Sequence, residues 1–195
     1  DSTRAARGSA AGGAGGARAA RHMGPPAQLK MLRYQLNPHF LFNTLNAIST
    51  LILDRDNATA NRMVQGLSSF LRHSLDNDPM QRVTLRQELD ALTLYLDIEK
   101  IRFAERLRIE TAIDEDCWRA LLPSLLLQPL VENAIKYAVA KQVAGGLLRI
   151  EAERDGEQLV LRVIDDGPGC SAIEGDQLPP GKGVGLRNTR ERLHV

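Results

Sequence analysis

The sequence has few of the features that mark secreted, membrane-spanning or DNA-binding proteins. Its two cysteines, Cys117 and Cys170, are too few for a disulfide framework and lack the ligand spacing of a zinc site. The longest apolar run, 121–127, is broken by Pro123 and Ser124 and is far shorter than the ~20 residues that span a bilayer. Aromatic residues make up 4% of the 195 residues and the net charge is +1, so no basic surface for nucleic acid is indicated. We therefore expect one or two small globular domains from a reducing compartment, with no nucleic-acid partner.

Residues 1–26 are dominated by alanine, glycine and arginine and offer almost no side chain that could fill a core. Such a composition cannot offset the entropy lost on ordering, so we expect a linker or an added tail. The segment has no apolar stretch of the kind found in signal peptides. The pair His22-Met23 is either a cloning junction or part of a native linker below a sensor region, and the sequence leaves both open.

Apolar residues then recur every three or four positions, which predicts three helices. Pro38 falls inside the first of these patterns. Asn57 is a plausible N-cap for the second, and Thr84 with Gln87 forms a capping box for the third. The predicted helices are 29–52, 57–76 and 84–103.

After residue 106 the pattern changes to the alternation typical of strands. Asp155-Gly156 is a hairpin turn signal between two of these strands. Pro123 suits the first turn of a helix that continues to Val139, and a last helix is expected at 186–193. The predicted strands are 107–111, 148–152 and 159–164. The whole pattern predicts an α+β fold, with a helical module in front of a mixed one.

The first candidate site is the run Asn37-Pro38-His39-Phe40. Proline inside a helix costs about 3 kcal/mol because it removes a donor and clashes with the preceding turn. The disturbed turn would present the imidazole of His39, which can act as a nucleophile when neutral. The alternative is a histidine packed in a helical bundle beside a chance kink.

The second candidate site lies on the predicted helix that ends at Val139. Asn133, Lys136 and Tyr137 stand at i, i+3 and i+4, so they share one helix face with Pro129. An amide oxygen beside an ammonium group suits a triphosphate bound with Mg²⁺. The alternative is an ordinary amphipathic helix with its polar side in solvent.

Two glycine-rich segments form the third candidate site. Asp165-Asp166-Gly167-Pro168-Gly169 follows a strand and offers a carboxylate beside a turn that a flat base can approach. Gly181-Lys182-Gly183-Val184-Gly185 precedes a helix start, a geometry that suits phosphate contacts through backbone amides. The alternative is a pair of surface loops. A dinucleotide fingerprint is a poor alternative because its third glycine would fall at Leu186 and little chain remains for a βαβ unit.

Taken together, these stretches closely resemble the LytS/YehU-type sensor histidine kinases over roughly residues 28–193. The matching segments are 37–43, 95–99 with Arg102-Phe103, 128–134, and 183–188 with 190–193. The resemblance implies a dimerisation and histidine phosphoacceptor hairpin at 27–82. It also implies a Bergerat-type ATP-binding domain at 83–195, the fold shared with Hsp90 and type II topoisomerase ATPase domains. Because the chain stops at Val195, we expect the final strands of that domain to be missing.

The resemblance also assigns roles to residues. His39 would be autophosphorylated from ATP, Asn133 would coordinate Mg²⁺, Lys136 would contact phosphate and Tyr137 would line the nucleotide. Asp165 would accept a hydrogen bond from the adenine amino group. The glycines that would shape the adenine wall and bound the lid are Gly167 and Gly169, then Gly181, Gly183 and Gly185, followed by Leu186.

The residue after His39 is Phe40, where most histidine kinases have an acidic residue, so a base must come from elsewhere. We nominate Glu132 because it precedes Asn133, and the alternative is a solvated glutamate on the helix face. His73 is a second histidine, but it lacks the preceding proline and is expected to pack in the hairpin.

The resemblance further implies a homodimeric four-helix bundle and a response regulator partner, of the LytTR type. It implies the cytoplasmic portion of an inner-membrane sensor whose membrane region is absent from this chain. Two other functions stay open. One is an ATPase of the same fold without histidine transfer, and the other is a dimeric signalling adaptor with impaired nucleotide binding.

Overall fold

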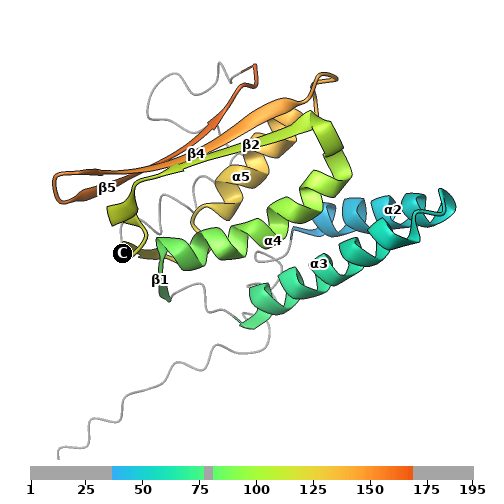
Figure 1. The fold of residues 1–195 in the computed structure, drawn as a ribbon, viewed down its shortest axis with the longest axis horizontal. Helices are drawn as coiled ribbons and strands as arrows, with labels where there is room; N and C mark the ends of the chain where they lie inside the picture. The colour runs from blue at the N-terminus through green and yellow to red at the C-terminus, as the bar shows by residue number, and fades with distance from the viewer. Residues whose placement is uncertain (1–36, 77–80, 169–195) are drawn as a thin grey trace, which may run out of the picture.

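The structure is a computed structural model, and it describes residues 37–76 and 81–168. Two helices, α2 (Pro38–Leu53) and α3 (Asn57–Asp76), form an antiparallel hairpin. A third helix, α4 (Leu85–Phe103), packs along α3 and lies between the hairpin and a β-sheet (Figure 1). The predicted helix at 186–193 and the second glycine segment lie outside the described residues.

The helix starts show where local sequence signals were sufficient and where they misled. The capping box of Thr84 and Gln87 is confirmed, with the Thr84 side chain accepting from the Gln87 N–H at 3.2 Å. The predicted interior position of Pro38 is wrong. Asn37 has extended backbone angles (φ −67°, ψ 106°) and caps α2, so Pro38 occupies the first turn, where no N–H donor is needed.

The N-cap of α3 is Asp56 and not Asn57, because Asp56 Oδ1 accepts from the Thr59 N–H at 3.1 Å.

The sheet has three strands in the order β2-β4-β5. Its strands are β2 (Leu107–Ile113), β4 (Gly146–Asp155) and β5 (Gln158–Asp165). β2 and β4 run parallel, whereas β4 and β5 form the hairpin that the Asp155-Gly156 turn predicted. Two short strands, β1 (Arg82–Thr84) and β3 (Leu121–Pro123), pair separately. Two single 3₁₀ turns, Ala104–Arg106 and Glu115–Cys117, flank β2.

The connection from β3 to β4 contains the helix that carries the second candidate site. The prediction that this helix begins at Pro123 is wrong, because Pro123 pairs with Arg82 in the small sheet. Helix α5 begins at Gln128 and runs to Ala134, and the chain continues as one π-helical turn, η3 (Ile135–Val139). π-turns inside helices occur frequently at functional sites.

One continuous core joins the helices to the sheet. Leu148, Ile150 and Ala152 of β4 point inward and belong to the same buried cluster as Phe40 of α2 and Met63 of α3. Within that core the carboxylate of Glu88 accepts the backbone N–H groups of two residues just before α5. The bonds run from Leu125 at 2.8 Å and from Leu127 at 2.9 Å.

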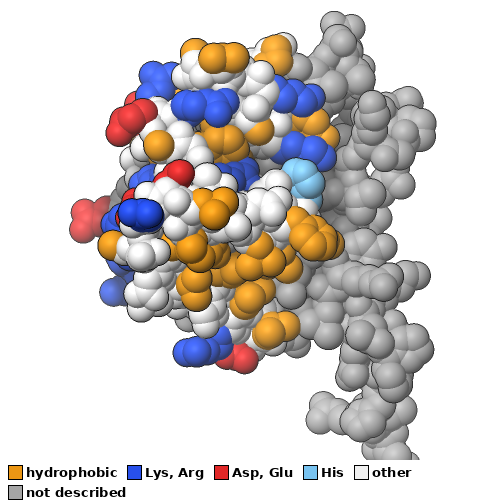
Figure 2. Space-filling view, turned by 90° about the vertical axis from the view of Figure 1, so that its right-hand side faces the viewer, with side chains coloured by type: hydrophobic (Ala, Val, Ile, Leu, Met, Phe, Trp, Pro, Cys, Tyr) orange, Lys and Arg blue, Asp and Glu red, His pale blue; other side chains and the backbone are white. Residues whose placement is uncertain are grey.

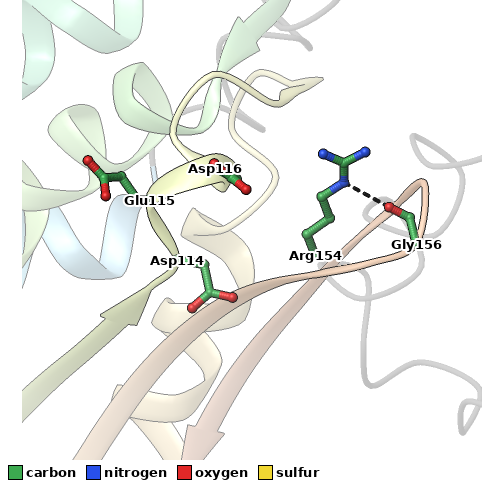
Figure 3. A pocket seen from close by; sticks show the side chains of 5 residues that line it. All are labelled: Asp114, Glu115, Asp116, Arg154 and Gly156. Carbon is green, nitrogen blue, oxygen red and sulfur yellow. Dashed lines mark hydrogen bonds between the residues drawn. The ribbon is translucent and has the colours of Figure 1, made fainter.

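A hollow lies at the far end of the sheet, away from α2. Its lining residues come from the segment after β2 and from the β4–β5 hairpin, and they are Asp114, Glu115, Asp116, Arg154 and Gly156 (Figure 3). Arg154 Nε donates to the carbonyl of Gly156 at 2.8 Å, so the cation of this group is held by the hairpin itself. None of the predicted site residues lines it.

Among residues 37–76 and 81–168, no helix has the length and apolar character to cross a bilayer.

Candidate functional site

His39 is exposed in the first turn of α2 in the single chain. Its ring atom Nδ1 lies 3.0 Å from Nδ2 of Asn43, one turn further along the helix. The next residue, Phe40, is buried, and its ring centroid lies 5.1 Å from that of Phe70 and 4.8 Å from that of Tyr95. The helix therefore turns its aromatic side inward and leaves the imidazole accessible.

The start of α2 is bonded to the helix of the second candidate site. Asn37 Oδ1 accepts from the backbone N–H groups of His39 and Phe40 at 3.1 and 3.4 Å. The Nδ2 of the same side chain donates to Glu132 Oε2 on α5 at 3.1 Å. Glu132 Oε1 accepts from Gln128 at 2.9 Å. The predicted base thus contacts Asn37 and Gln128, whereas the ring of His39 contacts Asn43.

The polar face predicted on this helix is present at the surface. Asn133 is half-buried, and Lys136 and Tyr137 are exposed. The ammonium group of Lys136 lies 5.1 Å from the Tyr137 ring centroid, and that of Lys141 lies 4.7 Å from the same centroid. Neither lysine has a carboxylate partner among the residues that the structure describes. Two cations at one exposed ring favour an anionic ligand.

Sequence reasoning missed Lys141. An α-helical spacing predicts Tyr137 and Lys141 as neighbours at i and i+4, but the helix predicted from the sequence ends at Val139. The π-turn widens the helix at this point, with the Ala140 N–H bonded to the Ile135 carbonyl at 2.8 Å. Lys141 lies two residues after the end of that turn, behind its C-cap Ala140. The i+4 spacing was the one signal in the sequence that could have identified it.

The first glycine segment lies against the same helix. A Cβ atom added at Gly167 would stand 2.7 Å from the Cβ of Ala138, so the turn after β5 packs directly on the π-turn. Asp165 Oδ1 accepts from the Gly167 N–H at 3.0 Å, and its other oxygen has no hydrogen bond within the described ranges. Asp166 is held by the Leu147 N–H at 2.7 Å. The remaining predicted nucleotide residues, Gly169, Gly181, Gly183, Gly185 and Leu186, lie outside the described residues.

A cluster of ionisable side chains is buried between α4 and α5. Burial raises the pKa of Glu99 to about 7; the nearby Glu132 adds to this, and Arg102 opposes it. Arg102 Nη2 lies 2.7 Å from Glu99 Oε2, but at an angle that does not make a hydrogen bond. Burial also raises the pKa of Glu132 and holds the pKa of Tyr95 well above its usual range. These groups lie directly behind the first turn of α2, because the ring of Tyr95 packs on Phe40.

The donor set fits a Mg-nucleotide better than a protein-bound metal. No group of three or more His, Cys, Asp or Glu side chains that could hold a metal ion occurs in the described part of the chain. Mg²⁺ keeps most of its waters and usually takes one or two protein oxygens together with substrate phosphates. Asn133 offers one such oxygen, and Lys136 offers the positive charge that a triphosphate attracts.

Comparison with known proteins agrees with this architecture. Residues 27–107 match the family model described as histidine kinase. Residues 120–194 match the model described as histidine kinase-, DNA gyrase B-, and HSP90-like ATPase. A helical module with an accessible histidine therefore precedes a module that matches the ATPase model. The chain belongs to the histidine kinase family.

Several curated sensor kinases are similar to this chain. Sensor histidine kinase BtsS of Escherichia coli K12 is 42% identical over 72% of the chain and 25% of the relative. Sensor histidine kinase YesM of Bacillus subtilis is 38% identical over 86% of the chain and 29% of the relative. Sensor protein LytS of Staphylococcus haemolyticus is 37% identical over 86% of the chain and 30% of the relative. The chain spans about a quarter to a third of the length of these relatives.

Proposed function

We propose that this chain is the phosphoacceptor and ATP-binding portion of a sensor histidine kinase. It transfers the γ-phosphoryl group of Mg-ATP to His39 and then to an aspartate of a response regulator. The observation that carries the proposal is the contact between the first turn of α2 and helix α5. Through Asn37 and Glu132 it joins the helix of an accessible histidine to the helix that bears Asn133 and Lys136.

Transfer requires an imidazole nitrogen with a free lone pair in line with the γ-phosphorus. The bond from that nitrogen to phosphorus forms as the bond to the β–γ bridging oxygen breaks, and ADP leaves. The amide of Asn43 can face His39 with its oxygen as well as with its nitrogen. With the oxygen facing Nδ1, the proton resides on Nδ1 and Nε2 is free to attack. Such transfer depends mainly on alignment and charge neutralisation.

The nucleotide site of the proposal is formed by three neighbouring features. Asn133 supplies an oxygen for Mg²⁺, Lys136 neutralises phosphate charge and Tyr137 lines the nucleotide. The free oxygen of Asp165 accepts a hydrogen bond from the adenine amino group, beside the turn at Gly167. The packing of that turn on Ala138 supports this arrangement. Glu132 as the base for His39 stays a prediction.

The proposal includes a homodimer that forms through the α2–α3 hairpin. Several apolar side chains on the outer sides of α2 and α3 are exposed, and Figure 2 shows hydrophobic side chains gathered on this side of the molecule. They are Phe42, Leu45, Ile52, Leu53, Val64 and Leu75. A second copy would cover this surface and complete a four-helix bundle. The response regulator, of the LytTR type by resemblance, would meet His39 on the exposed first turn of α2. The chain would lie in the cytoplasm below an inner-membrane sensor region.

The test is incubation with γ-labelled ATP and Mg²⁺. We expect a label on the protein that is acid-labile and alkali-stable and that is lost in His39→Gln. A label that persists in His39→Gln would move the phosphoacceptor to His73, and ATP hydrolysis that survives His39→Ala without protein labelling would indicate an ATPase. Absence of ATP binding would indicate an adaptor.

A further inference from the structure

The Asn37 side chain makes contacts in two directions at once. Its carbonyl oxygen accepts the N–H groups of His39 and Phe40, which caps α2. Its amide nitrogen donates to Glu132, 95 residues away in sequence. Capping uses the oxygen alone, and serine, threonine or aspartate would serve equally well. Capping therefore does not explain why the side chain at position 37 carries a hydrogen-bond donor.

The acceptor of this bond is itself held in place. Gln128 Nε2 donates to Glu132 Oε1 at 2.9 Å from one turn earlier on α5. The second oxygen of the carboxylate is thereby directed toward the start of α2, where Asn37 reaches it at 3.1 Å. A hydrogen bond to a charged, partly buried acceptor is stronger than one between neutral groups.

His39 stands between two anchored residues. Asn37 is fixed to α5 by the polar contact, and Phe40 is fixed by aromatic packing on Phe70 and Tyr95. The backbone at His39 is thus restrained from both sides, while its ring stays exposed. Because phosphoryl transfer depends on the placement of the attacking nitrogen, this restraint acts on the reaction itself.

We propose that Asn37 is a positioning residue for phosphoryl transfer. One amide group both caps the phosphoacceptor helix and docks its first turn on Glu132 of α5, the helix of the proposed nucleotide site. This role rests on the proposed function of His39. It acts on the rate of transfer and leaves nucleotide binding to other residues.

Two substitutions separate docking from capping. Asn37→Asp keeps the cap but replaces the donor by a carboxylate that repels Glu132. Asn37→Ser also keeps a cap, but its side chain is too short to reach α5. The matched control is Asp56→Asn, which changes the cap of α3, a helix start with no hydrogen bond to α5 among residues 37–76 and 81–168. We expect Asn37→Asp and Asn37→Ser to slow autophosphorylation at saturating ATP about tenfold or more, with the KM for ATP within about twofold of wild type. Asp56→Asn should leave both unchanged.

A second measurement follows docking without catalysis. In Asn37→Asp with Glu132→Gln the donor and acceptor are exchanged, so the glutamine can donate to the aspartate. We expect hydrogen exchange at the amides of His39 and Phe40 to be faster in Asn37→Asp and restored in the double variant. Wild-type or faster labelling in both Asn37 variants would overturn the proposal, and so would a loss expressed only in KM. If the wild-type protein acquires no acid-labile label, the proposed function itself fails. If hydrogen exchange at His39 and Phe40 is also unchanged in Asn37→Asp, the docking role of Asn37 fails as well.

Discussion

Gly167 packs so closely on Ala138 that the two residues leave no space for a side chain between them. A Cβ at position 167 would lie 2.7 Å from the Cβ and 3.0 Å from the Cα of Ala138. Real Cβ atoms do not approach other carbons so closely, so any larger residue must displace the turn. The separation between the Asp165 carboxylate and the helix of Tyr137 is therefore set by the absence of a side chain at Gly167.

Replacement of Gly167 by alanine should weaken nucleotide binding. The turn would move away from the helix and carry Asp165 with it, so we expect ATP affinity to fall about tenfold, which corresponds to about 1.4 kcal/mol. Titration with a fluorescent ATP analogue measures this directly. Ala138→Gly in the same chain removes one of the two nearest atoms, the other being Asp165 Oδ1 at 2.7 Å, and should recover part of the affinity. Unchanged affinity in Gly167→Ala would show that the turn does not contact the nucleotide.

Glu88 should be required for the segment that leads into α5. Its buried carboxylate accepts two backbone N–H groups, from Leu125 and Leu127, and Leu125 has a positive φ of 58°. Glu88→Ala removes the carboxylate acceptor of both N–H groups from the core, and we expect a loss of about 3 kcal/mol in the free energy of unfolding. Glu88→Gln keeps one acceptor oxygen and should lose about half as much. Urea unfolding followed by circular dichroism measures whether stability falls from wild type to Glu88→Gln to Glu88→Ala. Equal stability of all three proteins would contradict it.

Local patterns predicted the elements better than their first residues. The capping box at Thr84 and the turn at Asp155-Gly156 are confirmed because each is formed by residues close in sequence. Pro38 and Pro123 were misplaced because a proline marks a break without saying what precedes it. Pro38 opens a helix after an extended residue, and Pro123 ends a strand that pairs with Arg82. Pairing across 41 residues cannot be read from local periodicity.

In the candidate site, too, local sequence patterns predicted some features and missed those that depend on distant contacts. The spacing predicted the surface positions of Lys136 and Tyr137, and the role of this face in nucleotide binding stays a prediction. The contact between Asn37 and Glu132 joins segments 95 residues apart and depends on how the hairpin packs on α4, so no local pattern contains it. The wide turn at Ile135–Val139 was also invisible, because a π-turn has no distinct apolar spacing.

Two lysines should contribute to nucleotide affinity by charge. Lys136 and Lys141 both lie at the ring of Tyr137, and neither has an acidic partner among the residues described. We expect Lys136→Met to lower ATP affinity about tenfold and to reduce its dependence on salt, because one phosphate contact is lost. Lys141→Met should act in the same direction with a smaller effect. Lys100→Met, at an exposed position on α4, is the matched control and should change neither quantity. Calorimetric titration at two salt concentrations tests these expectations. An equal loss of ATP affinity in all three variants would show that the effect comes from the net charge of the protein and not from the site.

The buried carboxyl of Glu99 should make stability depend on pH near neutrality. Burial raises its pKa from 4.5 to about 7, so the folded protein binds this proton more tightly than the unfolded chain does. A raised pKa in the folded state means that stability is highest below pH 4.5 and falls as pH rises toward 7. Relative to Glu99→Gln, which carries no titrating group, wild type should lose about 3 kcal/mol across this interval.

Urea unfolding of both proteins at pH 4.5, 6 and 8 measures that difference. Glu153→Gln is the control with the opposite sign. Its hydrogen bond with Arg162 lowers the pKa of this exposed carboxyl, so any contribution is lost at acid pH. Carboxyls distant from Glu99 titrate alike in both chains, so their effects cancel in the comparison, whereas Glu132, whose charge raises the pKa of Glu99, contributes to the measured difference. Parallel stability curves for wild type and Glu99→Gln would show that Arg102 and the neighbouring Tyr95 keep Glu99 ionised in the folded protein. In that case the electrostatics behind the first turn of α2 would be set by a permanent ion pair and not by a proton.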